Sequence, residues 1–260
     1  MKAKRRKRRS RPSLRTRIGT YWVLGLMLVA VTGYALYALV TAPVFRVRSV
    51  GVTGLAHVAT SDVVRRAAID RRANVWLLDR AGIQRRIEAI PYVATARVHV
   101  TPPAHVWLDV VERTAEGCVR ELRGGSYTVD AALRVLEPGC TGAEALTYVV
   151  RARLGAEPGA FLHDPELLLL QADAKALAAN GDRYRSFAHD SYGDLEATLA
   201  DGIDVKFGND GDLERKQRLV APILAELGPR LGSVRTVDLR APATPVVEYR
   251  PGRQDPSPAP

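Results

Sequence analysis

A run of 28 uncharged residues, from Ile18 to Phe45, is the first pattern in the sequence. A helix rises about 1.5 Å per residue, so this run can extend for roughly 42 Å, against about 30 Å of hydrocarbon in a bilayer. Nine residues between Tyr21 and Val40 are leucine or valine, and Tyr21 and Trp22 are amphipathic rings that favour a membrane interface. We therefore predict one transmembrane helix, over residues 18–42.

The next segment alternates between apolar and polar positions and predicts a compact domain over residues 45–113. The runs 45–53, 93–101 and 106–112 have the period-two pattern of strands, and a Pro-Pro turn joins the last two into a hairpin. Short helices are predicted after Thr60 and after Asp79. The predicted order is strand, helix, helix, strand, strand.

Residues 114–250 are predicted to form a β-rich domain that contains two helices, so the fold class of the folded part is α+β. Apolar positions three and four apart predict helices over 164–179 and 212–227. The predicted strands are 119–122, 127–130, 133–136, 195–199, 203–207, 234–239 and 246–249. The proline-rich residues 251–260 are predicted to be a disordered tail, because they have too little apolar surface to order.

The net charge of +10 resides in the first 17 residues, which contain ten lysines and arginines and no acidic residue. Subtracting these ten from the 38 basic residues leaves 28, equal to the number of acidic residues. The rest of the chain is therefore formally neutral, and the high isoelectric point is a property of one tail.

The same charges orient the predicted helix. Ten basic residues precede it and only Arg46 and Arg48 follow closely, so the positive-inside rule places residues 1–17 in the cytoplasm. The prediction is a single-pass type II protein of the cytoplasmic (inner) membrane, with its bulk periplasmic or otherwise extracytoplasmic.

Two alternatives compete with this interpretation of the first 45 residues. Val40-Thr41-Ala42 weakly resembles the cleavage site of a signal peptide, although the apolar run is about twice the usual length of such a segment. The basic tail is also of the kind that binds RNA or acidic lipid. No aromatic residues interleave with its charges, which disfavours nucleic-acid binding.

Cys118 and Cys140 are the only cysteines of the chain. Both follow the predicted membrane helix, where an oxidising compartment permits a disulfide. They lie on either side of a predicted β-meander, so a bridge between them is possible. The alternative is a pair of buried thiols that act as small hydrophobic side chains.

The sequence contains no recognisable catalytic, cofactor-binding or metal-binding motif. The five histidines have no short ligand spacing, and Ser126 lacks the glycine two residues later that a nucleophile elbow requires. The pairs Asp109 with Glu112 and Asp190 with Asp194 are candidates for glycan cleavage, but carboxylates on alternating strands and loops are more often solvated. We predict no enzyme activity, cofactor or small-molecule substrate.

The last predicted strand is the candidate partner-binding site. A strand at a sheet edge exposes unpaired N–H and C=O groups, which a strand from a partner can complete. The candidate residues are Val246, Val247, Glu248, Tyr249 and Arg250. The alternative is an edge that the chain's own tail covers.

One family resemblance is carried by specific residues. The apolar strand positions, Gly54 and the pair Glu112-Arg113 resemble a polypeptide-transport-associated (POTRA) domain, and the basic arm and single anchor before it resemble the FtsQ (DivIB) family of bacterial cell-division proteins. Later residues similar to that family are Gly208, Lys216, Leu219, Leu224, Leu227 and Val237-Asp238-Leu239-Arg240. The chain departs from the family pattern at Thr114-Ala115, where a proline is usual, and at Leu133, where a glycine is usual.

The resemblance implies a non-enzymatic divisome scaffold at the division septum. Its implied partners are FtsB (DivIC) and FtsL, which bind outside the cytoplasm, and the complex helps recruit and regulate septal peptidoglycan synthesis. An alternative is a POTRA component of outer-membrane protein assembly or secretion, although such proteins usually continue into many membrane strands. A membrane-anchored cell-wall hydrolase is a third hypothesis.

Overall fold

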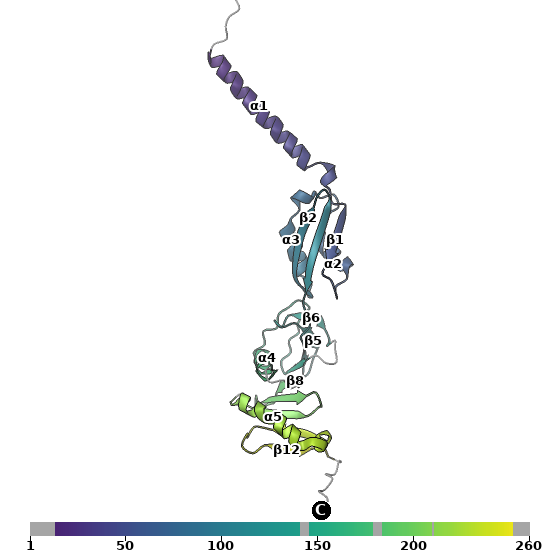
Figure 1. Ribbon diagram of the computed structural model, residues 1–260, viewed down its shortest axis with the longest axis vertical. Helices are drawn as coiled ribbons and strands as arrows, with labels where there is room; N and C mark the ends of the chain where they lie inside the picture. Colours follow the sequence, from purple (N-terminus) through teal and green to yellow (C-terminus); the bar gives the residue numbers. More distant parts are fainter. Residues whose placement is uncertain (1–13, 141–145, 179–183, 210, 252–260) are drawn as a thin grey trace, which may run out of the picture. The chain divides into compact units, whose positions relative to one another are not determined.

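The computed structural model describes residues 14–140, 146–178, 184–209 and 211–251 (Figure 1). Its folded part divides into two compact units, and each is described by itself below. Most of the predicted basic tail and residues 252–260 of the predicted disordered tail lie outside the described residues.

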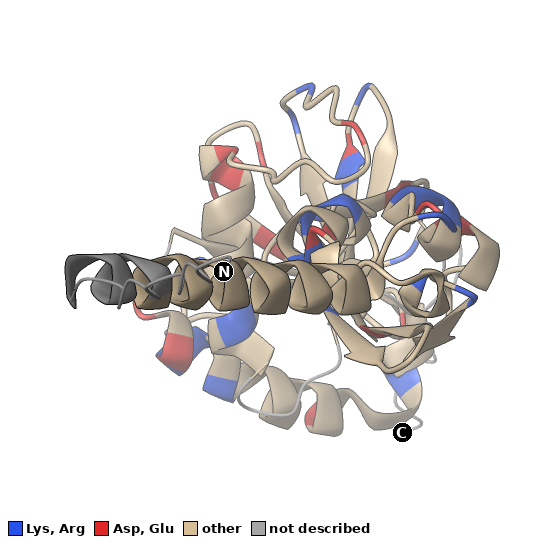
Figure 2. Ribbon diagram, turned by 90° about the horizontal axis from the view of Figure 1, so that it is seen from above, with Lys and Arg blue, Asp and Glu red and all other residues tan. Residues whose placement is uncertain are grey.

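The N-terminal helix α1 runs from Leu14 to Val40. Its side chains are exposed from Tyr21 to Leu39, and Figure 2 shows no charged residue along this stretch. The segment Tyr21–Phe45 is long and apolar enough to cross a membrane, and none of it is buried in the protein. The predicted apolar helix is therefore present, and its side chains from Tyr21 to Leu39 are not covered by any other part of the described chain.

A three-stranded sheet with strand order β1-β3-β2 follows α1. Because β1 pairs parallel with β3, the chain must cross over between them, and it does so through the helices α2 and α3 and then the strand β2. Asp79 accepts a hydrogen bond from the Gly82 amide and so caps α3 as predicted. The elements are η1 Pro43–Phe45, β1 Ser49–Thr53, α2 Thr60–Ala67, η2 Val75–Leu77, α3 Arg80–Glu88, β2 Val93–Thr101 and β3 His105–Glu112.

The predicted strand, helix, helix, strand, strand order is confirmed, with one correction at its start. The first strand begins at Ser49 and not at Phe45, because Pro43 opens a short 3-10 turn and Arg46 pairs only in an isolated bridge with Asn74. Alternate residues of the hairpin, among them Val106 and Leu108, are buried against the helices' apolar faces.

The second sheet has nine strands in the order β12-β11-β10-β9-β8-β7-β4-β5-β6. The helices are α4 Pro165–Ala178 and α5 Leu213–Leu227, with the 3-10 helix η3 Gly228–Ser233 after α5. The strands are β4 Gly117–Glu121, β5 Ser126–Val129, β6 Val135–Pro138, β7 Leu146–Val150, β8 Tyr184–His189, β9 Leu195–Leu199, β10 Asp204–Gly208, β11 Val234–Asp238 and β12 Val246–Tyr249.

The core of this β-rich unit lies between the sheet and the two helices. Leu167, Leu170 and Leu177 are fully buried on α4, as the spacing of its apolar residues predicts. On α5 the most buried residues are Lys216, Gln217 and Val220, whereas the leucines and Ile223 nearer its end are only half-buried. The Lys216 ammonium is satisfied, since it donates to the Asn209 carbonyl at 2.9 Å.

A disulfide joins Cys118 of β4 to Cys140, which lies just beyond β6, with the two Cα atoms 5.5 Å apart. Since β5 lies between β4 and β6 in the sheet, the bridge links the two ends of a three-stranded segment. Closing a loop of 22 residues removes conformations from the unfolded chain, which stabilises the folded state by about 3 kcal/mol in the chain-entropy model.

We expect the double substitution Cys118→Ser and Cys140→Ser to lower the free energy of unfolding by about 2 to 4 kcal/mol. Chemical denaturation of the exported region measures this change. A disulfide-linked peptide containing both cysteines should appear in mass spectra of the unreduced digest. Full alkylation of both thiols without reductant contradicts the bridge.

The turn between β5 and β6 places Leu133 in the left-handed region, with φ of 59°. Asp130 organises this turn, because its carboxylate accepts hydrogen bonds from the amides of Ala132 and Arg134. Leu133 itself is buried. This is the position where the resembled family has glycine, so the fold keeps the glycine-type conformation and adds an apolar contact.

We predict that Leu133→Gly destabilises the protein less than Leu133→Ala. Both changes remove the buried side chain, at a cost of about 2 to 5 kcal/mol. Only glycine also removes the left-handed strain, which is worth roughly 1 kcal/mol. Denaturation midpoints of the two variants measure the difference, and an alanine variant as stable as the glycine variant contradicts the strain.

Glu121 is a buried carboxylate at the end of β4 with four hydrogen-bond donors. Its oxygens accept from the amides of Gly125, Leu154 and Gly155 and from the Tyr127 hydroxyl, at 2.7 to 3.2 Å. Burial raises the pKa of Glu121, but these hydrogen bonds outweigh it and hold the pKa below its usual value. The ionised side chain therefore ties two loops to the strand.

We expect Glu121→Gln to cost on the order of 2 kcal/mol at neutral pH, because one or more buried amides lose a charged acceptor. A carboxylate with a depressed pKa stabilises the fold above its unfolded pKa of about 4.3, and that contribution is lost as the pH falls through the folded pKa. The stability difference between wild type and variant should therefore shrink on acidification. Unfolding curves at neutral and acidic pH measure it, and a difference independent of pH contradicts the role.

Candidate partner-binding edge

The strand β12 forms one edge of the nine-stranded sheet. It pairs antiparallel with β11, with Val247 opposite Val237 and Val246 opposite Asp238. Four of the five residues proposed from the sequence, Val246 to Tyr249, lie on this strand, and Arg250 follows directly. The structure therefore gathers all five at an edge.

The backbone hydrogen bond of Arg250, just after β12, shows which backbone groups of the strand face its neighbour and which face outward. The Arg250 amide donates to the Ser233 carbonyl at 2.8 Å, so Arg250 faces the neighbouring chain segment. Backbone groups alternate along a strand, hence those of Val247 and Tyr249 point to the open side. Within the described chain, no backbone group pairs with them there. The edge is ready to accept another strand.

The opposite edge of the sheet is closed by the chain itself. Beside β6, the Val135 amide donates to the Ala160 carbonyl and the Val135 carbonyl accepts from the Gly159 amide. The Leu133 carbonyl likewise accepts from the Leu162 amide. Covered edges resist pairing with other chains. Strand addition requires unpaired backbone N–H and C=O groups, which the β12 edge has and the β6 edge lacks along these residues.

A groove of about 420 Å³ borders β12 on the side of α5. Figure 1 shows both elements at the C-terminal end of the chain. The Tyr249 side chain is 42% exposed, and half-buried Ile223 and Leu227 offer apolar surface beside it. The lining residues are Ile223, Glu226, Leu227, Arg230, Pro245, Val247 and Tyr249.

The α5 residues of this groove were not among the sites predicted from the sequence. Ile223 and Leu227 lie four residues apart in the helix predicted over 212–227, a spacing that by itself indicates burial in the core. They remain half-exposed because the sheet ends at β12 and no further strand covers them. The apolar spacing of Ile223 and Leu227 is visible in the sequence, but only the position of the sheet edge shows that these side chains border a groove.

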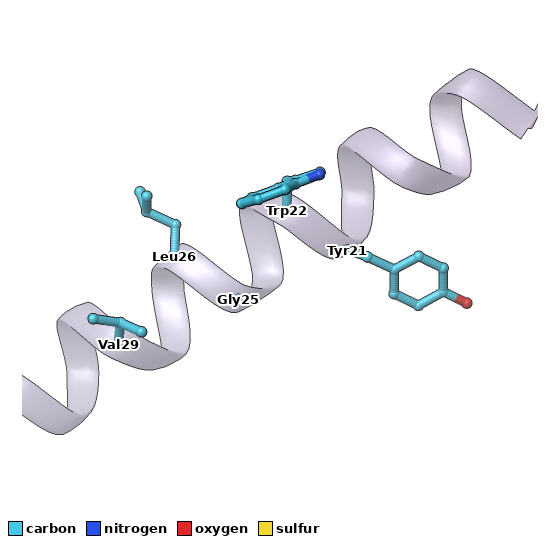
Figure 3. Close-up of a pocket in the computed structure, with 5 residues that line it drawn as sticks. All are labelled: Tyr21, Trp22, Gly25, Leu26 and Val29. Atoms are coloured by element: carbon cyan, nitrogen blue, oxygen red, sulfur yellow. The ribbon is translucent and has the colours of Figure 1, made fainter.

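A second hollow lies on α1 and has no chemical groups for catalysis. It is formed over Gly25, whose missing side chain leaves space between Trp22 and Val29. Figure 3 shows Trp22, Leu26 and Val29 on one side of the helix and Tyr21 projecting from another. All its lining residues come from one helix, so it is an apolar helix surface.

The carboxylates considered for catalysis are engaged elsewhere. Burial raises the pKa of Glu112, but hydrogen bonds from the amides of Val58 and His57 outweigh it and lower the pKa. Asp109 accepts from the Thr53 hydroxyl at 2.7 Å. Asp190 accepts from the amides of Tyr192 and Asp194 and organises a turn, which lowers its pKa. Asp109, Glu112 and Asp190 thus each accept hydrogen bonds that hold a strand or a turn in place.

Within the described residues, no group of three or more histidine, cysteine, aspartate or glutamate side chains is arranged to hold a metal ion. The two cysteines are joined to each other. The arrangement at β12 therefore offers main-chain pairing and a partly apolar groove, which suit a polypeptide.

Comparison with known proteins bears on the family resemblance of the chain. Residues 45–113 match the family described as "POTRA domain, FtsQ-type". The chain is 28% identical to the cell division protein FtsQ of Syntrophotalea carbinolica, with 94% of this chain and 90% of the relative covered. It is 29% identical to the FtsQ of Chloroflexus aurantiacus, with 88% and 82% covered, and 27% identical to that of Myxococcus fulvus, with 73% and 68% covered.

The domain match and these similarities over most of the chain confirm the resemblance seen in the sequence: the chain contains an FtsQ-type POTRA domain and is similar to FtsQ cell division proteins.

Proposed function

We propose that this protein is a non-enzymatic scaffold of the divisome that captures partner proteins by strand addition at β12. The proposed partners are FtsB (DivIC) and FtsL, and the proposed consequence is recruitment and regulation of septal peptidoglycan synthesis. The observation that carries the proposal is the unpaired edge of β12 in a chain related to FtsQ proteins.

The physical case for strand addition rests on unsatisfied backbone groups and adjacent apolar surface. A strand paired with the open side of β12 would satisfy the outward groups of Val247 and Tyr249, and each net hydrogen bond is worth about 1 kcal/mol. Side chains of the added strand would alternate between the two sheet faces. Those on the α5 side would enter the groove beside Tyr249 and Ile223.

The proposed location is a cytoplasmic membrane, with residues 1–17 in the cytoplasm and the folded units outside it, enriched at the septum. The apolar helix α1 and the basic residues before it support this orientation. The proposed domains are the basic tail, the helix over residues 18–42, the POTRA domain 45–113, the β-domain 114–250 and the tail 251–260. Outer-membrane assembly, the alternative function, is not favoured by relatives that are named for cell division.

We expect Val247→Pro to abolish partner capture while the protein still folds. Proline removes an N–H that faces outward, and edge strands tolerate this because the ladder with β11 is unaffected. Glu248→Pro should instead lower thermal stability, because the amide of Glu248 faces β11. Co-purification from membranes and thermal melting measure the two effects, and full partner capture by a folded Val247→Pro protein contradicts strand addition.

The side-chain contribution has its own test. Replacing Val247 and Tyr249 together by glutamate should reduce capture about tenfold or more, since apolar groove contacts worth at least 1.4 kcal/mol are lost. Leu169→Lys on α4 is the matched control, because Leu169 is 61% exposed and lies away from β12. Equal capture by the double variant and the control shows that the groove does not bind partners.

A further inference from the structure

Residues 70–80, here called the Trp76 loop, connect α2 to α3 and pass the end of the membrane helix. The Asn74 side-chain amide donates to the Val40 carbonyl, the last residue of α1, at 2.7 Å. The Ala73 carbonyl accepts from the Val47 amide at 3.1 Å. The rings of Phe45 and Trp76 meet edge to face, with centroids 6.0 Å apart. The loop is therefore fixed to the residues where the chain leaves α1.

The length of α1 determines at which level of the bilayer the contact between Val40 and Asn74 lies. The uncharged part of the helix, from Ile18 to Val40, has 23 residues, which extend for roughly 35 Å. This is a few ångströms more than the about 30 Å of hydrocarbon. When the helix spans, the Val40 carbonyl comes to the boundary between hydrocarbon and headgroups, and Asn74 is held at the same level.

The loop exposes large apolar side chains at this level. Trp76 is 47% exposed and Leu77 is 70% exposed, although the neighbouring Val75 is fully buried. The Trp76 amide donates to the Asn74 side chain at 2.9 Å, which fixes the start of the short helix η2. Val44, in the segment after α1, is 44% exposed. Tryptophan beside leucine is the combination that favours a membrane interface over water.

Exposed arginines lie close in sequence to these apolar residues. Arg71, Arg72 and Arg80 belong to the loop, and Arg46 and Arg48 follow the helix. Against these five cations stand only Asp70 and Asp79, which leaves a net local charge of three. Both carboxylates accept backbone hydrogen bonds, from Arg72 and Gly82. In the described chain, no carboxylate forms an ion pair with any of the five arginines.

We propose that the Trp76 loop is a lipid-binding surface, with Trp76 and Leu77 inserted among the headgroups and Arg71, Arg72 and Arg80 bound to phosphates of anionic phospholipids. A guanidinium binds phosphate oxygens in a bidentate manner. The loop is held to the end of a membrane-length helix. This attachment favours a bilayer over a protein as the partner that covers Trp76 and Leu77. The inference rests on the membrane location proposed above.

This contact would restrain the POTRA domain at its first strand. A chain held only by a flexible linker is free to tilt, whereas a second attachment beside the helix limits that motion. The lipid contact would then help fix the orientation of the POTRA domain at the membrane. This role is distinct from partner capture at β12.

Three single-tryptophan proteins test the proposal in the full-length chain, which has three tryptophans. Replacing two of Trp22, Trp76 and Trp107 by phenylalanine leaves the third as the fluorescent reporter. The proteins are reconstituted in vesicles of phosphatidylcholine, with or without phosphatidylglycerol, and quenched by phosphatidylcholine brominated near the headgroup. Thermal melting confirms that each variant is folded.

Trp22 reports the membrane span, and Trp107 is the matched control. Trp107 lies on β3 opposite Gly51 of β1, four residues beyond the level of Val47 and Ala73, or about 13 Å along a strand. We expect quenching and a blue shift for Trp22 and Trp76, and neither for Trp107. Quenching of Trp22 without Trp76 overturns the lipid contact alone. If Trp22 is not quenched, the membrane location itself is wrong.

A charge-reversed pair tests the arginines. Phosphatidylglycerol should increase the quenching of Trp76, and Arg71→Glu with Arg72→Glu should remove that increase. Arg65→Glu with Arg66→Glu on α2 changes the charge by the same amount at exposed positions outside the loop, and it should leave the increase intact. An equal loss in both pairs, or no loss in either, overturns phosphate binding by the loop.

Discussion

The structure depends on one constraint, which is that the apolar surface of α1 must be removed from water. Its side chains from Tyr21 to Leu39 are exposed along the helix, and none of the membrane-length segment is buried in the protein. At roughly 25 cal/mol for each Å² of apolar surface, a helix of this size is very costly to leave in water. A bilayer removes that cost and at the same time satisfies the helix backbone internally. In the proposed topology, the folded units after Val40 lie on one side of the membrane.

The two edges of the nine-stranded sheet differ, because one is paired by the chain's own backbone and the other is open. The β6 edge is paired by residues 159–162, and the disulfide from β4 to Cys140 ties the same end of the sheet. The β12 edge is open and lies beside a groove under α5. An open edge is a liability for aggregation unless a partner covers it. Under the proposed function, a strand from a partner protein would cover this edge.

Much of the fold could be predicted from the sequence because its signals are local. The apolar helix, the capping of α3 by Asp79 and of α4 by Asp164, and the hairpin of β2 and β3 follow from spacing and residue type. The strands β7 and β8 were not predicted. In β8 only Phe187 is fully buried, so the alternation that reveals a strand is absent. It pairs antiparallel with β9 and parallel with β7, and no local pattern encodes the parallel pairing.

The candidate site was predictable only in part, because local residue patterns indicate a strand but not its place in the sheet. Val246 to Tyr249 have the composition of a strand, but their place at the open edge depends on nine strands assembling in one order. The groove residues of α5 became recognisable only when β12 was located. At Leu133 the sequence departs from the family pattern while the backbone retains the left-handed conformation, because the Asp130 side chain fixes the turn by hydrogen bonds to two amides.

The central claim is that a permanent membrane helix holds the folded units outside the cytoplasm. The most direct test is a pair of fusions after Arg250, one to alkaline phosphatase and one to green fluorescent protein, in membranes fractionated from growing cells. The account predicts active phosphatase, dark fluorescent protein and a membrane-bound, uncleaved polypeptide. Bright fluorescent protein with inactive phosphatase, or release of the folded part from the membrane, would contradict it.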